Sequence, residues 1–294
     1  MTTGLIVNAD DFGLTSGVNR AIVELHAAGV LTSATLMARA AATDEAIEIA
    51  KATPSLGVGC HVVLVDGEPV LSAVHDVPAI CEATKPRFLP TLGLFLFNIY
   101  QQNHWTSKVE HQIEIEARAQ LESLLSRGLR LTHIDTHKHT HMFPRVLRPV
   151  LRAARRCGIR AVRNPFEPAW SVRSTLSAPL TRRLQVRLLR LLERRFRRIV
   201  AEEGFVTTEG AIGVLATGTL DAGSVAGLVR AMPQDGKIYE LVTHPGYNDA
   251  DLARVSTRLR QSRETEREAL LELRTAPNLE LISFSGLQQT QTVD

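Results

Sequence analysis

Short apolar runs alternate with amphipathic helical patterns along most of the chain. Eight runs are predicted to form strands, at residues 4–9, 32–37, 56–64, 131–137, 160–163, 211–216, 237–243 and 279–284. Helical patterns lie between most of them, first from an expected N-cap at Ser16 to Gly29, then at residues 44–52, 108–125, 144–157, 180–203, 222–232 and 252–273. This alternation is typical of an α/β fold with a parallel sheet. The strand count predicts a closed or nearly closed (β/α) barrel that resembles a TIM barrel and can be distorted.

Residues 65–107 interrupt this alternation. The stretch is rich in proline, aromatic residues and short apolar runs, as in FLPTLGLFLFNIY at 88–100. It is too long for a plain connection between a strand and a helix, so we interpret it as an insertion after the third strand that covers a site. The chain shows neither an internal repeat nor a linker-like stretch. Residues 1–294 are therefore expected to form one domain.

Composition places the chain among ordinary globular proteins. It has 294 residues, 44% hydrophobic and 22% charged, with a mean hydropathy of -0.01. These values exclude global disorder, and no run of apolar residues is long enough for a membrane-spanning helix. The N-terminus lacks the basic start of a signal peptide. Three widely spaced cysteines argue against a disulfide framework, and no CxxC pair suggests structural zinc. A cytoplasmic location is expected.

Positive charge is concentrated in one segment. The net charge is +3, yet residues 182–198 hold eight arginines and one glutamate, a local +7, which leaves about -4 for the rest of the chain. The segment lacks the interleaved aromatic residues and the known motifs of nucleic-acid binders. We therefore expect no nucleic-acid partner.

Candidate chemistry lies where parallel strands end, because that edge of a barrel or open sheet holds the active site. The first strand ends in Asp10 and Asp11, the third carries His61, and His244 follows the seventh. Each has a simpler interpretation when taken alone. The aspartates suit a turn or a helix cap, His61 suits a hydrogen-bonded core position, and His244 suits a turn before Pro and Gly.

The segment HIDTHKHTH is the most unusual feature. His133, Asp135, His137, His139 and His141 occupy every second position, and alternate residues of a strand share one face. A solvated histidine-rich turn is the alternative. Imidazole is the commonest metal ligand near neutral pH. One carboxylate and two imidazoles with open positions would make a catalytic metal site, and a spare aspartate and histidine would serve proton transfer in metal-assisted hydrolysis.

Four motifs together resemble one family. NADDFG at 8–13, GCHVVL at 59–64, HIDTHKHTHMFP at 133–144 and THPGY at 243–247 resemble the YdjC-like carbohydrate deacetylases, in family order. That family includes chitooligosaccharide deacetylases and deacetylases of hopanoid lipid biosynthesis. The resemblance implies a barrel-like deacetylase fold and removal of acetyl from an N-acetylated amino sugar.

The resemblance also implies roles for individual residues. It implies one divalent metal ion held by Asp11, His61 and His137, with Zn or Mg foremost and Mn or Co also suitable. Asp10 is the implied base, and His244 matches the late histidine of the family and is the candidate acid. The neighbouring residues are expected to support the ligands or bind substrate: His133, Asp135, His139, His141 and Arg163.

Two substrates and several other functions stay open. RAVRNPFEP at 160–168 resembles the hopanoid branch, which favours a lipid-linked N-acetylglucosamine over a soluble chitooligosaccharide. Residues 179–203 form an amphipathic pattern whose leucines are expected to be buried. Its arginines would then face either solvent or anionic lipid, with residues 92–100 against a lipid tail. The alternative functions are a metal-dependent phosphoesterase and a non-catalytic sugar-binding module. The strand ends offer too few carboxylates for the phosphoesterase. A homodimer is compatible with the sequence.

Overall fold

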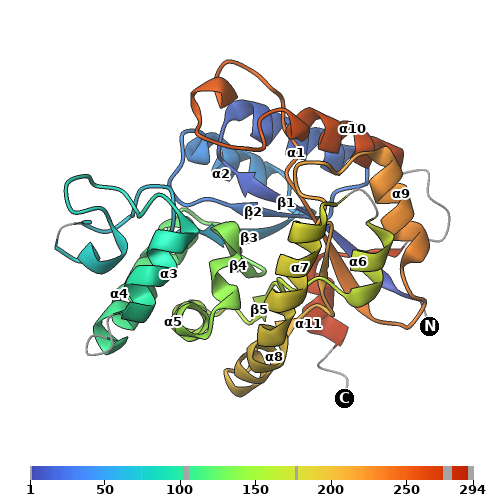
Figure 1. The fold of residues 1–294 in the computed structure, drawn as a ribbon. Coiled ribbons are helices and arrows are strands. Elements are labelled where there is room, and N and C mark those ends of the chain that lie inside the picture. The colour runs from blue at the N-terminus through green and yellow to red at the C-terminus, as the bar shows by residue number, and fades with distance from the viewer. Residues whose placement is uncertain (1, 74, 102–105, 176–177, 274–279, 291–294) are drawn as a thin grey trace.

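The computed structural model describes residues 2–73, 75–101, 106–175, 178–273 and 280–290, and one parallel sheet organises them (Figure 1). Its strands are β1 (Gly4–Phe12), β2 (Ser33–Leu36), β3 (Gly57–Val62), β4 (Ile134–Thr136), β5 (Ala161–Val162), β6 (Val206–Thr207), β7 (Ala211–Ile212), β8 (Ile238–Thr243) and β9 (Glu280–Leu281). The hydrogen-bonded order is β6-β5-β4-β3-β2-β1-β8-β7, and β9 pairs with β1.

The two ends of this order are joined by the chain itself. Residues 208–210 connect β6 directly to β7, and Asn164, which follows β5, donates to the backbone carbonyls of Thr208 and Glu209. The sheet therefore curves into a distorted barrel, which confirms the predicted α/β, TIM-barrel-like class. The sequence did not predict β6. The strand expected at 279–284 is shorter, since β9 ends at Leu281 and Phe284 begins a helix; position 279 lies outside the described residues.

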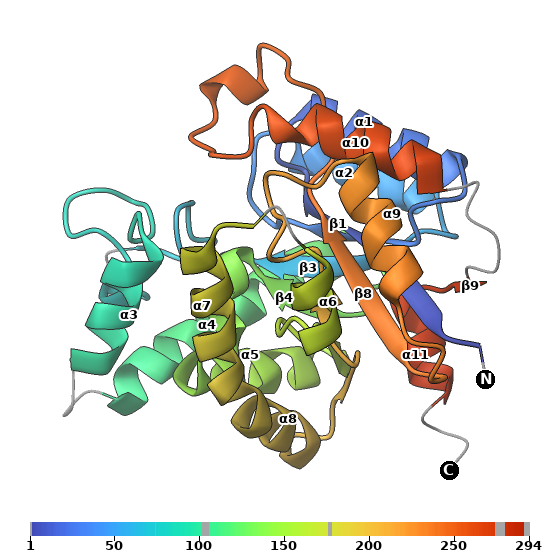
Figure 2. The ribbon, with the colours of Figure 1, turned by 45° about the vertical axis from the view of Figure 1, so that its right-hand side comes forward.

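The helices surround this sheet. The α-helices are α1 (Ser16–Ala27), α2 (Thr43–Ala52), α3 (Leu92–Gln101), α4 (Thr106–Leu125), α5 (Pro144–Arg156), α6 (Ala169–Ser174), α7 (Leu180–Leu189), α8 (Glu193–Glu202), α9 (Ala222–Ala231), α10 (Ser262–Leu273) and α11 (Phe284–Thr290). Short 3-10 helices are η1 (Pro78–Ile80), η2 (His137–Met142), η3 (Arg190–Leu192) and η4 (Leu252–Arg254). Figure 2 shows α1, α2 and α10 on one side of the strands and α4, α5 and α8 on the other.

Burial follows from this arrangement. All nine residues of β1 and all six of β3 are buried, because helices or the barrel interior cover both faces. The N-cap of α1 is Thr15 rather than the expected Ser16, since the Thr15 hydroxyl accepts from the backbone N–H of Val18. Among the described residues, no helix has the combination of length and apolar character needed to cross a bilayer.

The stretch at 65–107 packs on α4 through buried polar side chains. Glu116 accepts from the backbone N–H groups of Val70 and Leu71, at 2.8 and 3.0 Å, and Gln112 accepts from that of Ala79 at 2.8 Å. Buried backbone groups need such partners, so these contacts fix an irregular segment against a helix. Positions 74 and 102–105 of this stretch lie outside the described residues.

The segment at 180–203 differs most from the prediction. It is not one helix but α7, η3 and α8, and its leucines are not uniformly buried. Phe196 and Ile199 of α8 are buried as expected, whereas Leu180, Leu184 and Leu191 are 83, 58 and 78% exposed. The expectation that the leucine side is buried is therefore wrong for α7 and holds for α8 only. The helix expected at 252–273 is likewise divided, into η4 and α10.

Candidate active site

Asp10 and Asp11 lie just before the end of β1, and both contact histidines of one site. Neighbouring side chains of a regular strand face opposite ways. Here the pairing of β1 with β2 shifts register between Ala9 and Phe12, and Asp11 has a left-handed backbone with φ of 64°. This irregularity lets two adjacent residues supply carboxylates to the same site.

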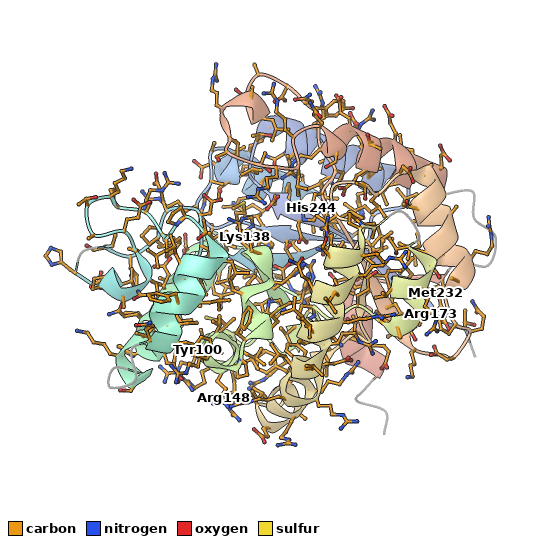
Figure 3. All side chains as sticks on the ribbon, in the orientation of Figure 1. Tyr100, Lys138, Arg148, Arg173, Met232 and His244 are labelled. Carbon is orange, nitrogen blue, oxygen red and sulfur yellow. The ribbon has the colours of Figure 1, made fainter. Side chains whose placement is uncertain are left out.

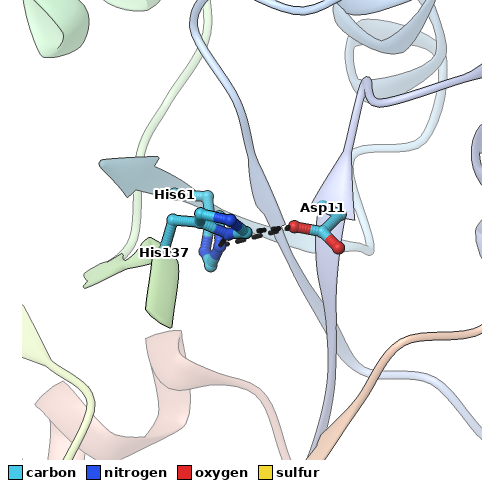
Figure 4. Close-up of side chains that lie close together, drawn as sticks. All are labelled: Asp11, His61 and His137. Atoms are coloured by element: carbon cyan, nitrogen blue, oxygen red, sulfur yellow. Dashed lines mark hydrogen bonds and ion pairs between the residues drawn. The ribbon is translucent and has the colours of Figure 1, made fainter. Parts of the chain in front are cut away.

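Asp11, His61 and His137 bring three potential ligand atoms together (Figure 4). Asp11 Oδ1 lies 3.6 Å from His61 Nε2 and 3.5 Å from His137 Nδ1, and the two nitrogens are 3.2 Å apart. Asp11 Oδ1 is buried and has no hydrogen-bond partner among the described residues. A divalent cation would satisfy this oxygen and both nitrogens, so the donors fit the metal that the resemblance implies.

The other oxygen of Asp11 is held by Arg263 of α10. Arg263 Nη2 donates to Asp11 Oδ2 at 2.5 Å, and both side chains are buried. Burial by itself raises the pKa of Asp11, but Arg263, His137 and His61 hold it well below its ordinary value. Asp11 is therefore ionised at neutral pH, the form in which a carboxylate binds a cation.

Asp135 orients His61. Its Oδ1 lies 2.7 Å from His61 Nδ1, and Thr35 Oγ1 lies 3.2 Å from the same nitrogen, which leaves Nε2 toward Asp11. Burial lowers the pKa of His61, but Asp135 and the two aspartates of β1 raise it to about 9. A carboxylate behind an imidazole fixes its tautomer and is typical of metal-binding histidines.

Asp10 is held in a buried network beside the triad. Arg163 Nη1 and Nη2 donate to its two oxygens at 2.8 and 2.6 Å, and Asn8 Nδ2 donates at 3.0 Å. Burial opposes ionisation, but the Arg163 guanidinium holds the pKa of Asp10 far below its ordinary value. Asp10 Oδ2 also lies 3.7 Å from His244 Nε2. The implied base and the implied acid therefore lie next to each other.

Arg163 is fully buried among three carboxylates. Its guanidinium lies 2.5 Å from Asp135 Oδ2 and 2.7 Å from Glu240 Oε1, in addition to the contacts with Asp10. One guanidinium does not neutralise three carboxylates. Burial, with the charges of Asp10 and Asp135, therefore raises the pKa of Glu240 to about 7.

A second cluster of potential ligands shares atoms with this network. Oxygens of Asp10 and Asp135 lie within 4.8 Å of each other and of His61. Unlike Asp11 Oδ1, however, these oxygens already accept from Arg163 and Thr35. The unpartnered oxygen of Asp11 makes the first cluster the better candidate for a metal.

His244 follows β8 and is held by Glu266 of α10. Its backbone N–H donates to Glu266 Oε2 at 2.6 Å, and its ring Nδ1 lies 3.7 Å from the same oxygen. Burial lowers the pKa of His244, but Glu266 and the two aspartates of β1 outweigh it, so the pKa is raised. A histidine with a raised pKa keeps the proton that a general acid needs.

The remaining histidines of HIDTHKHTH do not share one strand face. The strand ends at Thr136, and Lys138 and His139 are left-handed inside η2. The prediction of a continuous alternation is therefore wrong after Thr136. The turn matters to the site because the Lys138 ammonium lies 2.8 Å from Asp66, which ties the turn bearing His137 to the stretch at 65–107. Figure 3 shows Lys138 and His244 near the middle of the view.

His133, His139 and His141 lie outside the triad. The ring of His133 stacks on Phe284 with centroids 3.7 Å apart, and His141 Nδ1 lies 2.7 Å from Thr136 Oγ1. Burial lowers the pKa of His133 and of His139 to about 3 and that of His141 to about 4. These pKa values favour neutral imidazoles, and the burial of His133 and His141 contradicts a solvated histidine-rich turn.

Sequence reasoning missed Glu240, Arg263 and Glu266. Glu240 lies in the apolar strand KIYELVT, and the other two lie three residues apart on a helix, so they share its buried face. A charged residue at a position expected to be buried was the available signal. The partners of these residues come from distant parts of the chain, which the sequence pattern does not reveal.

Comparison with known proteins agrees with the four motifs. The model of the family described as YdjC-like protein matches residues 4–280. A carbohydrate deacetylase of Brevibacillus brevis is 36% identical over 292 residues, covering 96% of this chain and 99% of the relative. A chitooligosaccharide deacetylase of Salmonella paratyphi B is 34% identical over 156 residues, covering 53% of this chain and 57% of the relative.

A solved structure shares the fold. The crystal structure of a putative cellobiose-phosphate cleavage protein from Enterococcus faecalis superposes with a TM-score of 0.73, at 23% identity, covering 98% of this chain and 99% of that one. At that identity the likeness concerns the fold alone. The family match over most of the chain and the full-length relative settle the assignment. This chain belongs to the YdjC-like family.

Proposed function

We propose that the protein is a metal-dependent hydrolase that removes the N-acetyl group from an N-acetylglucosamine-containing substrate. The observation that carries this proposal is the unpartnered Asp11 Oδ1 between two histidine nitrogens, with Asp10 and His244 beside it. The names of the relatives, carbohydrate deacetylase and chitooligosaccharide deacetylase, support the same reaction.

The metal would be held by Asp11, His61 and His137. These donors offer one oxygen and two nitrogens, a set that suits Zn, Mg, Mn or Co, with the first two foremost. A divalent ion bound there would acidify water and polarise the acetyl carbonyl. Arg263 and Asp135 hold Asp11 and His61 in position from behind.

Asp10 is the proposed general base. Its lowered pKa keeps it ionised, and the contacts with Arg163 and Asn8 keep its carboxylate in one orientation. Attack of water on the amide carbon needs a group to accept the proton of that water. Asp10 borders both the triad and His244, so the proton would pass to its oxygen.

His244 is the proposed general acid. The departing sugar amine must take up a proton as the C–N bond breaks, because an amide anion is a poor leaving group. Glu266 and the two aspartates of β1 raise the pKa of His244, which favours the protonated imidazole that a general acid needs. Its Nε2 faces Asp10, so acid and base would lie on the same side of the substrate amide. Acetate and a free amino sugar are the products.

The reaction is tested by amine release from N-acetylglucosamine derivatives. We expect release of free amine and acetate that stops with EDTA and returns when a divalent ion is added. Hydrolysis of p-nitrophenyl phosphate without amine release would favour a metal-dependent phosphoesterase. Sugar binding without turnover of any acetylated sugar would favour a non-catalytic binding module.

We further propose a lipid-linked N-acetylglucosamine as the preferred substrate, with a soluble chitooligosaccharide as the alternative. The exposed apolar side chains Leu94 and Phe97 of α3, 51 and 61% exposed, support an apolar tail. The resemblance at 160–168 does not add to this, because Arg163 and Asn164 are buried scaffold residues. Faster turnover of diacetylchitobiose than of a lipid-linked N-acetylglucosamine would refute the lipid preference.

A further inference from the structure

The outer side of α7 and η3 carries four leucines that face solvent. Their exposed fractions are 83, 58, 57 and 78% for Leu180, Leu184, Leu188 and Leu191. Spacings of four, four and three residues place them along one side of a helix. No residue of α7 is buried, so the described part of the chain leaves this side uncovered.

The arginines of residues 182–198 divide into two sets. Four turn toward the protein and bond backbone carbonyls or Glu193: Arg182, Arg183, Arg190 and Arg197. The other four are exposed and form no ion pair within the described ranges: Arg187, Arg194, Arg195 and Arg198. Spacings of three or four residues from Leu184 or Leu191 place Arg187, Arg194 and Arg195 on the helix side that carries the leucines, so these arginines add positive charge there.

We call these eight exposed residues the leucine–arginine face: Leu180, Leu184, Leu188, Leu191, Arg187, Arg194, Arg195 and Arg198. A second apolar helix lies near it. Tyr100, at the end of α3, is 41% exposed. Burial raises the pKa of its phenol, and the charges of Arg145 and Arg195 oppose this rise, which places the positive charge of Arg195 near the end of α3. Figures 1 and 2 both place α7 between α3 and α6.

We propose that the leucine–arginine face docks on a membrane surface that contains anionic phospholipids. Helices that lie in a membrane interface combine exposed leucines with arginines or lysines around them. The leucines would enter the boundary between headgroups and acyl chains, and the guanidinium groups would contact lipid phosphates. The proposal rests on this face alone and does not depend on the deacetylation reaction.

Charge argues against a second copy of the chain as the occupant. In a symmetric contact the same face would supply both sides. The only carboxylate within residues 180–198 is Glu193, which already pairs with Arg190 and Arg197. A dimer would therefore desolvate exposed arginines without giving them a partner, which is unfavourable. Lipid phosphates supply that partner.

The test is co-sedimentation of the purified full chain with phosphatidylcholine vesicles, with and without phosphatidylglycerol. We expect binding only with phosphatidylglycerol, and weaker binding at high salt because salt screens the arginines. Arg194→Gln together with Arg195→Gln should lower the partition coefficient by roughly 25-fold, at about fivefold for each arginine. Leu184→Gln together with Leu188→Gln should lower it by roughly tenfold at unchanged net charge.

A matched control removes two charges elsewhere. Arg230 of α9 and Arg254 of η4 are exposed and lie outside the leucine–arginine face. Arg230→Gln with Arg254→Gln should bind vesicles like the wild type, and all variants should keep the wild-type melting temperature. An equal loss in this control, or no vesicle binding by the wild type, overturns the proposal. The proposal is also overturned if the wild type forms a concentration-dependent dimer that the leucine variant does not form, and if the wild type does not bind vesicles.

Discussion

The backbone N–H of His244 donates to Glu266 Oε2 at 2.6 Å, and the imidazole Nδ1 of His244 lies 3.7 Å from the same oxygen. A single buried carboxylate thus fixes the turn that carries the histidine and raises the pKa of its ring. Glu266 would affect the proposed reaction only through its contacts with His244, so we regard it as a positioning residue.

Glu266→Gln should weaken the acid without removing it. The neutral amide can still accept from the backbone N–H, but it no longer stabilises a protonated imidazole. We expect kcat to fall by about tenfold with KM little changed. The alkaline limb of the kcat profile should move to lower pH, because His244 then loses its proton earlier.

Glu268 on the same helix provides the control for Glu266. It is exposed, and its side chain contacts Arg267 rather than the site. Glu268→Gln should leave both kcat and the position of the alkaline limb unchanged. If Glu266→Gln lowers kcat by reducing the folded fraction alone, the pH profile will keep its shape, and the positioning role is refuted.

Asp10→Asn should separate chemistry from metal binding. The asparagine cannot accept a proton from water, so turnover should fall by about 10² or more, the scale for loss of a general base. Metal content, measured by plasma mass spectrometry, should match that of the wild type, because the triad is intact. Loss of metal would instead make Asp10 a ligand. Melting temperatures should be compared as well, since the change also weakens the contact with Arg163.

The strand ends could be predicted because each buried strand is a local run of apolar residues, and polar residues follow directly where the strand ends. The apolar runs before Asp10 and His244 mark β1 and β8, and the polar residues that follow mark the mouth of a barrel. The two-residue strand β6 was missed because Val206 and Thr207 are only partly buried and show no alternation. Two residues are too short for a periodic signal.

Side-chain partners and helix faces were less predictable. The left-handed positions Lys138 and His139 end the alternation that HIDTHKHTH suggests, since the pattern alone does not show where the chain turns. Arg263 and Glu266 gain their roles only when α10 packs against the ends of β1 and β8. Leu180, Leu184 and Leu188 of α7 look like core residues in the sequence. Only the three-dimensional structure shows that nothing in its described part covers them.

His137→Ala should lose metal and activity together. His137 supplies one of three potential ligand atoms, and removing one such atom from an open site weakens binding strongly. We expect about one divalent ion per wild-type chain and a clear deficit in the variant, by plasma mass spectrometry after dialysis. His111→Ala, an exposed position on α4, is the control and should retain the ion. Stoichiometric metal in His137→Ala would show that the proposed ligand set is wrong.

Glu240→Gln should change how stability depends on pH. In the fold, the pKa of Glu240 is raised from 4.5 to about 7, so folding favours its protonated form. The stabilisation linked to this group is complete below its unfolded pKa and is lost as pH rises through about 7. Glutamine offers Arg163 a neutral acceptor at every pH. The variant therefore does not lose this stabilisation as pH rises. Unfolding free energies of the metal-free wild type and variant should therefore diverge between about pH 5 and 8 in favour of the variant. A tenfold change in an acid dissociation constant corresponds to about 1.4 kcal/mol, so we expect the divergence to exceed that value. Urea unfolding at several pH values measures this difference, and parallel curves for the two proteins would show that Glu240 is ionised throughout.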